Sequence, residues 1–162
     1  MLILNTGGTF NKRYNPLTGE MEVPFDNLAP EAILSTFTYD YEMAGLIYKD
    51  SLDLDLDDRK MMVNIIAASE KTHFIIIHGT DTMDQTASFL DEVLDDKVVI
   101  LTGAMVPFET DPVEATSNLA MALGYAKLQD EAGVYICMQG SVASHDKLIK
   151  NKKLGKFKLV QD

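Results

Sequence analysis

The sequence predicts an α/β fold: a doubly wound, mostly parallel sheet with helices on both faces. Short apolar runs alternate with segments of about ten to fifteen residues that have helical character, and this alternation is typical of βαβ units. Several apolar runs also end in a Thr-Gly or Gly-Thr turn, and open α/β folds bind ligands beyond the carboxyl ends of their strands. With 162 residues, 46% of them hydrophobic, the chain has the size and composition of one soluble domain. We therefore expect a single Rossmann-like domain over residues 1–162.

Residues 1–5 are expected to form a buried strand, and the turn Thr-Gly-Gly-Thr follows at 6–9. Two adjacent glycines allow positive φ or a close backbone approach to a ligand. Residues 10–24 are polar, with turn signals at Asn15-Pro16 and Thr18-Gly19, and their last four residues suit the return arm of a hairpin. This segment is either a lid over the glycine turn or a plain surface hairpin, and the pattern leaves both open.

The next expected elements are a short helix over 30–35 and a strand over 42–48. Residues 49–58 alternate acidic residues with leucine, which fits an exposed strand or a loop. We expect the loop, with Asp57 as the N-cap of a helix over 59–69. Apolar residues recur at helical spacing in that helix, which indicates an amphipathic face.

The second half of the chain repeats the order of strand, turn and helix. We expect strands over 73–78, 98–101 and 134–138, and helices over 83–94 and 116–128. Beyond residue 138 the pattern weakens. The stretch from Lys147 to Lys158 holds six lysines and no acid, whereas residues 1–96 hold 18 of the 25 acids. These lysines form a solvated basic tail, or one of them returns to the acidic body and takes part in chemistry there.

Composition excludes several classes of function. The formal net charge of −11 argues against nucleic acid as a partner, because phosphate backbones attract lysine and arginine. No apolar run approaches the roughly 20 residues that span a membrane, and the N-terminus lacks the basic segment of a signal peptide. We therefore expect a cytoplasmic protein with no membrane contact. Cys137 lies in an apolar run and is expected to be a buried, inert thiol.

The turns after the strands at 1–5 and 73–78 carry the candidate chemistry. If these strands are parallel neighbours, Thr9 and Thr80 emerge at the same edge of the sheet. Neither G-x-G-x-x-G nor G-x-x-x-x-G-K-[ST] occurs, so dinucleotide or phosphate binding is not expected. The three histidines lack the spacing of metal ligands. We therefore expect neither a metal nor an organic cofactor.

A threonine hydroxyl becomes a nucleophile when a base removes its proton and when donors face the oxyanion that forms. A threonine on a Gly-Gly turn has backbone N–H groups beside it. A second threonine next to Asp81, with a lysine as base, would complete a proton relay. The plain alternative is that the Thr-Gly pairs are ordinary turns and that Asp81 caps the following helix. Spacing alone leaves both open.

Three turns carry distinctive sequences: Thr-Gly-Gly-Thr at 6–9, His-Gly-Thr-Asp-Thr-Met at 78–83 and Thr-Gly-Ala-Met-Val-Pro at 102–107. In this order they resemble the signatures of the bacterial-type L-asparaginase/glutaminase family. The resemblance spans nearly the whole chain, and the hexapeptide is highly specific. It implies the fold of that family's N-terminal domain.

The resemblance also implies roles for individual residues, each through the position that it matches. Thr9 matches the nucleophile, and Thr80 with Asp81 matches the second catalytic threonine and its neighbour. Lys158 matches the lysine that completes the relay, and Tyr14 lies in the loop where the family keeps a catalytic tyrosine on a flexible lid. The positions implied to bind substrate are Ser51, Gly79 and Asp81.

The function implied by the resemblance is hydrolysis of L-asparagine, or of L-glutamine, to the acid and ammonia through an acyl-enzyme. Leu52 stands where many members have glutamine, and Val106 stands where arginine is common. The family's smaller C-terminal domain has no counterpart in this sequence. Leu52 and the missing domain favour an alternative, a non-catalytic amino-acid-binding or interaction module on the same fold. We expect the enzyme, as a homo-oligomer in which another subunit covers the crevice.

Overall fold

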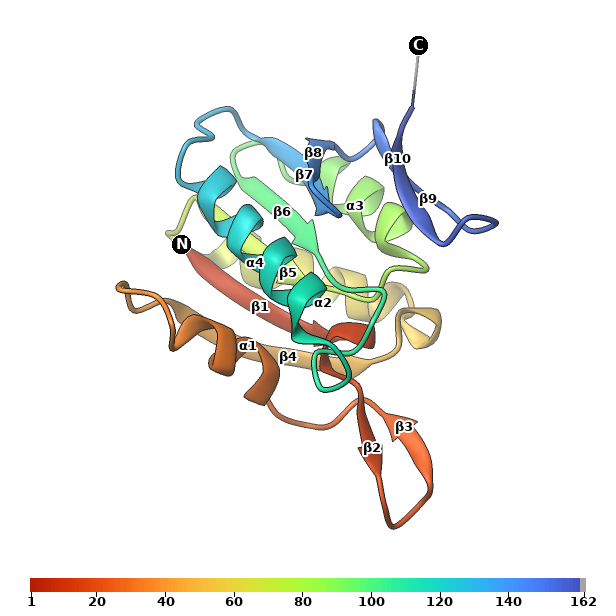
Figure 1. The fold of residues 1–162 in the computed structure, drawn as a ribbon. Helices are drawn as coiled ribbons and strands as arrows, with labels where there is room; N and C mark the ends of the chain where they lie inside the picture. Colours follow the sequence, from red (N-terminus) through yellow and green to blue (C-terminus); the bar gives the residue numbers. More distant parts are fainter. Residues whose placement is uncertain (161–162) are drawn as a thin grey trace.

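The computed structural model describes residues 1–160 and confirms the predicted α/β class. The main sheet has six strands in the order β4-β1-β5-β6-β7-β8 (Figure 1). The first five are parallel, and β8 is antiparallel to β7. The strands are β1 (Leu2–Gly7), β4 (Glu42–Lys49), β5 (His73–Ile77), β6 (Val98–Thr102), β7 (Gly133–Met138) and β8 (Ser141–Ser144).

Helices cover both faces of the sheet, as a doubly wound fold requires (Figure 1). Alternate residues of a strand point to opposite faces. Leu4 and Ile76 therefore pack in a core with α2 and α3, whereas Ile3 and Ile75 pack in a second core with α1 and α4. Within residues 1–160, no helix is both long enough and apolar enough to cross a membrane. The helices are α1 (Leu28–Leu34), α2 (Leu56–Ala68), α3 (Met83–Asp91) and α4 (Pro112–Ala126).

Capping residues move two helix starts from their predicted positions. The N-cap of α2 is Asp55, not Asp57, so the helix begins three residues earlier than predicted. The Asp55 carboxylate accepts the N–H groups of residues 57 and 58, and the Asp58 carboxylate accepts the Asp55 N–H at 3.0 Å. This reciprocal capping box fixes the start. Helix α4 begins at Pro112 because Asp111 caps it and proline suits the first helical position.

Two hairpins lie outside the main sheet. Strands β2 (Arg13–Asn15) and β3 (Glu20–Glu22) pair antiparallel within the segment 10–24 and project from the body of the domain (Figure 1). Strands β9 (Leu148–Asn151) and β10 (Lys156–Leu159) form the second hairpin, which the sequence pattern did not predict. This second hairpin brings the basic C-terminal stretch back to the sheet.

Candidate active site

Three turns meet at the carboxyl edge of the sheet, after β1, β4 and β5. Strands β1 and β5 are parallel neighbours, so the expectation that Thr9 and Thr80 share one edge is confirmed. A Cβ atom added to Gly8 would lie 2.4 Å from the backbone N and Cα atoms of Gly79. A Cβ atom added to Gly79 would lie 2.6 Å from the Cβ atom of Ser51. The three turns therefore touch, and only glycine fits at the two contact positions.

Hydrogen bonds hold the turns in this arrangement. The Thr6 hydroxyl donates to the carbonyl oxygen of Ile77 at 2.8 Å, which joins the end of β1 to the end of β5. The Gly8 N–H donates to the carbonyl oxygen of Lys49 at 2.9 Å, which joins the first turn to the loop after β4. Thr9 begins the 3-10 helix η1 (Thr9–Asn11), directly after the first turn, and is partly exposed.

Lys150 on β9 joins the second turn to the C-terminal hairpin. Its ammonium group donates to the hydroxyl of Thr80 and to the carboxylate of Asp81, each at 2.8 Å. The lysine side chain is only 13% exposed. Asp81 does not cap helix α3, because the N-cap position belongs to Thr82, whose side chain makes no capping hydrogen bond. The plain interpretation of Asp81 as a helix cap is therefore wrong.

The lysine beside Thr80 and Asp81 is Lys150, not Lys158, which corrects the expectation from the sequence. Lys158 lies on β10 and pairs with Ile149 on β9. Cross-strand partners share one face of a hairpin, and neighbours along a strand point to opposite faces. Lys158 therefore lies on the face opposite Lys150, and it is exposed. A signal was present in the sequence: Leu148 lies two residues before Lys150 and shares its face, and this buried aliphatic side chain anchors that face to the body.

Ser51 is fixed beside the same turn. It begins the 3-10 helix η2 (Ser51–Asp53) and is 1% exposed. Its hydroxyl oxygen accepts the Asp81 N–H at 3.2 Å, and its carbonyl oxygen accepts the Thr82 hydroxyl at 2.7 Å. The Ser51 O–H proton can still be donated, so the residue can bind an anionic group. The next residue, Leu52, is 68% exposed.

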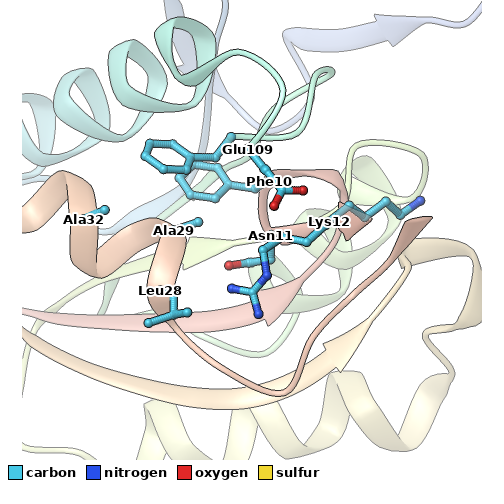
Figure 2. Close-up of a pocket in the computed structure, with 9 residues that line it drawn as sticks. Phe10, Asn11, Lys12, Leu28, Ala29, Ala32 and Glu109 are labelled. Atoms are coloured by element: carbon cyan, nitrogen blue, oxygen red, sulfur yellow. The ribbon is translucent and has the colours of Figure 1, made fainter. Parts of the chain in front are cut away.

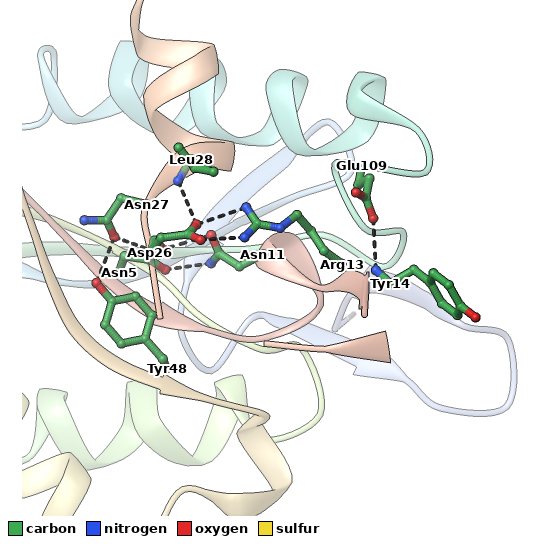
Figure 3. Close-up of polar contacts among 9 residues, drawn as sticks. All are labelled: Asn5, Asn11, Arg13, Tyr14, Asp26, Asn27, Leu28, Tyr48 and Glu109. Atoms are coloured by element: carbon green, nitrogen blue, oxygen red, sulfur yellow. Dashed lines mark hydrogen bonds and ion pairs between the residues drawn. The ribbon is translucent and has the colours of Figure 1, made fainter. Parts of the chain in front are cut away.

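Tyr14 lies on the projecting hairpin rather than on the three turns. Its side chain is 57% exposed, and the ring points away from the other labelled residues in Figure 3. Its backbone N–H donates to the carboxylate of Glu109 at 3.0 Å, which ties the hairpin to the loop between β6 and α4. The structure therefore does not bring the Tyr14 phenol to Thr80.

A buried amide network behind the first turn was not predicted (Figure 3). The Asn5 side chain accepts the Gly7 N–H at 3.0 Å and the Asn11 side-chain amide at 2.7 Å, and it donates to Asn27 at 2.9 Å. Asn11 also donates to the Gly7 carbonyl at 3.0 Å. The signal was Asn5 itself, because a polar residue in a buried strand requires hydrogen-bond partners. The network fixes the backbone from which Thr9 extends.

An apolar pocket of about 370 Å³ lies beside the hairpin base, between η1 and α1 (Figure 2). Its lining includes Phe10 and Phe108, and Ala29 and Ala32 of α1. Thr80 and the residues around it do not line this pocket. It is a neighbour of the candidate site and not part of it.

Burial shifts the pKa values of two groups, His78 at the end of β5 and Cys137 on β7. His78 is fully buried, and burial lowers its pKa to about 4, although its Nδ1 atom lies 2.6 Å from the carbonyl oxygen of Gly79. The imidazole is therefore neutral near pH 7. Cys137 is buried as expected, and burial raises its pKa to about 12. Across residues 1–160, no three His, Cys, Asp or Glu side chains gather in a way that could hold a metal ion.

Known proteins are similar to this chain in sequence and in fold. The chain is 42% identical over 72 residues to L-asparaginase 2 of Escherichia coli, an alignment that covers 43% of this chain and 21% of the relative. It is 25% identical over 154 residues to Glutaminase-asparaginase of Acinetobacter glutaminasificans, which covers 88% of this chain and 46% of the relative.

The solved structure of the thermostable L-asparaginase from Thermococcus kodakarensis superposes with a TM-score of 0.83 at 25% identity, covering 98% of this chain and 50% of that one. The chain thus spans about half the length of that protein. The family model described as Asparaginase, N-terminal matches residues 1–156. The resemblance seen in the sequence is therefore confirmed, and the chain belongs to the asparaginase family through its N-terminal domain.

Proposed function

We propose that the protein is an amidohydrolase that converts L-asparagine to L-aspartate and ammonia with Thr9 as nucleophile. The observation that carries the proposal is the contact of Lys150 with Thr80 and Asp81, on a turn that touches the turn of Thr9. A hydroxyl nucleophile needs a route for its proton. Lys150, which is poorly exposed and hydrogen-bonded to the Thr80 hydroxyl, supplies such a route. Two of the relatives described above are named L-asparaginases.

In the first half of the reaction, the Thr9 oxygen bonds to the carbon of the side-chain amide. Its proton passes to Thr80, the Thr80 hydroxyl proton moves to Lys150, and the Lys150 ammonium gives a proton to the Asp81 carboxylate that it contacts. Backbone N–H groups near Thr9 and Thr80 stabilise the oxyanion. When the C–N bond breaks, the proton moves to the leaving nitrogen and ammonia departs, which leaves an ester on Thr9. In the second half, water attacks the ester, its proton follows the same route, and the Thr9 hydroxyl is restored.

Substrate binding is assigned to the groups around these threonines. The hydroxyl of Ser51 donates to the α-carboxylate of the substrate, and the backbone at Gly79 lies beside it. Asp81 binds the α-ammonium group. It uses one carboxylate oxygen for Lys150, and its side chain is partly exposed, so the second oxygen is available to substrate. The hairpin within residues 10–24 acts as a lid that carries Tyr14, and no metal or organic cofactor takes part.

The test is ammonia release from L-asparagine and L-glutamine. We expect wild type to be active, Thr9→Ala to be inactive, and Lys150→Met to lose about 10²–10⁴-fold in kcat, the usual contribution of a general base. Lys158→Met is the matched control, since it removes a lysine from the other face of the same C-terminal hairpin. It should stay within about twofold of wild type. Equal losses in the two lysine variants would contradict the role of Lys150.

A specific observation favours the second candidate, a non-catalytic amino-acid-binding module. Leu52 exposes an aliphatic side chain next to Ser51, where a polar side chain would contact substrate. Calorimetry separates the two functions: if wild type binds asparagine or glutamine and releases no ammonia from either, the module is the correct function.

We further propose that the protein acts in the cytoplasm as a homo-oligomer, with residues 1–162 as one domain and a second subunit covering the three turns. Sedimentation at micromolar protein should show an assembly larger than the 18.0 kDa chain. Sedimentation of the monomer alone would exclude this part of the proposal.

A further inference from the structure

The segment that follows Thr9 is joined to the loop of Ser51 by an ion pair. Lys12 comes directly after η1, and its backbone N–H donates to the carbonyl oxygen of Thr9 at 3.1 Å. Its ammonium group donates to the carboxylate of Asp50 at 2.5 Å. The two side chains are each 26% exposed, so water screens the pair less than it screens a fully exposed one.

Asp50 also contacts the loop that contains Ser51. Its second carboxylate oxygen accepts the Leu52 N–H at 3.1 Å and so caps η2, the turn that contains Ser51. Ser51 in turn accepts the Asp81 N–H through its hydroxyl. Lys12 is therefore linked to Asp81 by two polar contacts, Lys12 to Asp50 and Ser51 to Asp81, and by the capped turn η2 that joins Asp50 to Ser51.

The charge of Asp50 is maintained by its surroundings. Burial acts to raise the pKa of Asp50, but the hydrogen bonds from Lys12 and from the Leu52 N–H outweigh it, and the pKa lies below its usual value. The positive charges of Lys12 and Lys150 act in the same direction. The ion pair is therefore fully formed at neutral pH.

Lys12 also lies at the base of the β2–β3 hairpin, and the two residues that follow it in the chain hold the hairpin to other parts of the domain. The Arg13 guanidinium binds both carboxylate oxygens of Asp26 just before α1, and the Tyr14 N–H binds Glu109 (Figure 3). Of these three consecutive residues, only Lys12 has a partner adjacent to Ser51.

We propose that Lys12 is a positioning residue that couples the β2–β3 hairpin to Ser51 through Asp50. When the hairpin moves, the ion pair transmits the displacement to η2 and so to the group that holds the substrate. This inference rests on the proposed function in one respect, the binding of substrate by Ser51. Lys12 itself does not touch the reacting atoms.

The kinetic test compares KM and kcat for L-asparagine in wild type, Lys12→Met and Lys12→Arg. Methionine keeps most of the length of the side chain and removes its charge. We expect the KM of Lys12→Met to rise about tenfold with kcat within about twofold of wild type, because a binding group is loosened and the relay is intact. Arginine keeps the charge, so Lys12→Arg should recover most of the loss. An unchanged KM in an active Lys12→Met enzyme overturns the substrate role of Lys12.

Lys71→Met is the matched control for loss of a lysine ion pair. Lys71 pairs with Glu42 at 2.7 Å, is 33% exposed, and lies near the start of β5, at the edge of the sheet away from the three turns. Its removal should leave KM within about twofold of wild type. A rise equal to that of Lys12→Met would show a general effect of lost charge and would overturn the proposal.

Hydrogen–deuterium exchange tests the coupling independently of activity. In Lys12→Met, the peptide that covers residues 50–54 should exchange about tenfold faster than in wild type, and the helix over 112–126 should exchange at the wild-type rate. Unchanged exchange over 50–54 overturns the coupling, whether or not the protein is active. If wild type releases no ammonia, the proposed function fails on that result alone, and faster exchange over 50–54 still supports the coupling.

Discussion

Replacement of Gly8 by alanine tests the contact on which the whole site depends. Gly8 has a φ of 71° and a ψ of −172°, a combination that is essentially confined to glycine and costs an L-residue about 1–3 kcal/mol. The added Cβ would also lie 2.4 Å from the backbone of Gly79, where no flexible side chain can yield. Overpacking of this kind costs about 1–3 kcal/mol. We therefore expect Gly8→Ala to lower the free energy of unfolding by about 3 kcal/mol.

Gly19→Ala separates the two contributions. Gly19 has nearly the same φ, 77°, but a Cβ there would meet no atom within 4 Å. Its replacement should therefore cost only the backbone part, about 1 kcal/mol. Urea unfolding followed by circular dichroism measures both variants. With an m-value of about 2 kcal/mol/M, the midpoints should differ by about 1 M. If Gly8→Ala unfolds at the same urea concentration as Gly19→Ala, the turns of Thr9 and Thr80 do not touch, and the proposed site is incorrect.

Two further predictions concern stability. Burial lowers the pKa of His78 to about 4 from 6.5, so the unfolded chain binds the proton first as the pH falls. The contribution of His78 to the free energy of unfolding is therefore present above pH 6.5 and is lost as the pH falls toward 4, a total loss of about 3 kcal/mol. Urea unfolding at successive pH values measures this loss, and the His78→Asn variant should not show it. Asp55→Ala should destabilise the protein by about 1 kcal/mol through loss of the α2 cap, whereas Asp57→Ala should change stability by less than about 0.5 kcal/mol. Equal thermal shifts in these two variants would contradict the capping assignment.

The parallel strands could be predicted from the sequence because they are buried on both faces. Continuous apolar runs such as Phe74–Ile77 and Val98–Leu101 have no other explanation in a chain of this size, and each is fully or nearly fully buried. The edge position of β4 beyond β1 was not predictable in this way, since strand order depends on long-range packing. The amide network around Asn5 was not predicted either, because the partners of Asn5 lie up to 22 residues away in the sequence.

The choice between Lys150 and Lys158 shows the limit of what the sequence alone can predict about the site. Both lysines follow an apolar residue in a polar stretch, and composition does not separate them. They are separated by the pairing of β9 with β10, in which Lys150 shares a face with Phe157 and Lys158 shares the opposite face with Ile149. A shift of one residue in that pairing would exchange the two faces. The identity of the candidate lysine is therefore set by hairpin register and by the burial of Leu148. The sequence shows Leu148 as an apolar residue two positions before Lys150, but its burial and the register appear only in the folded chain.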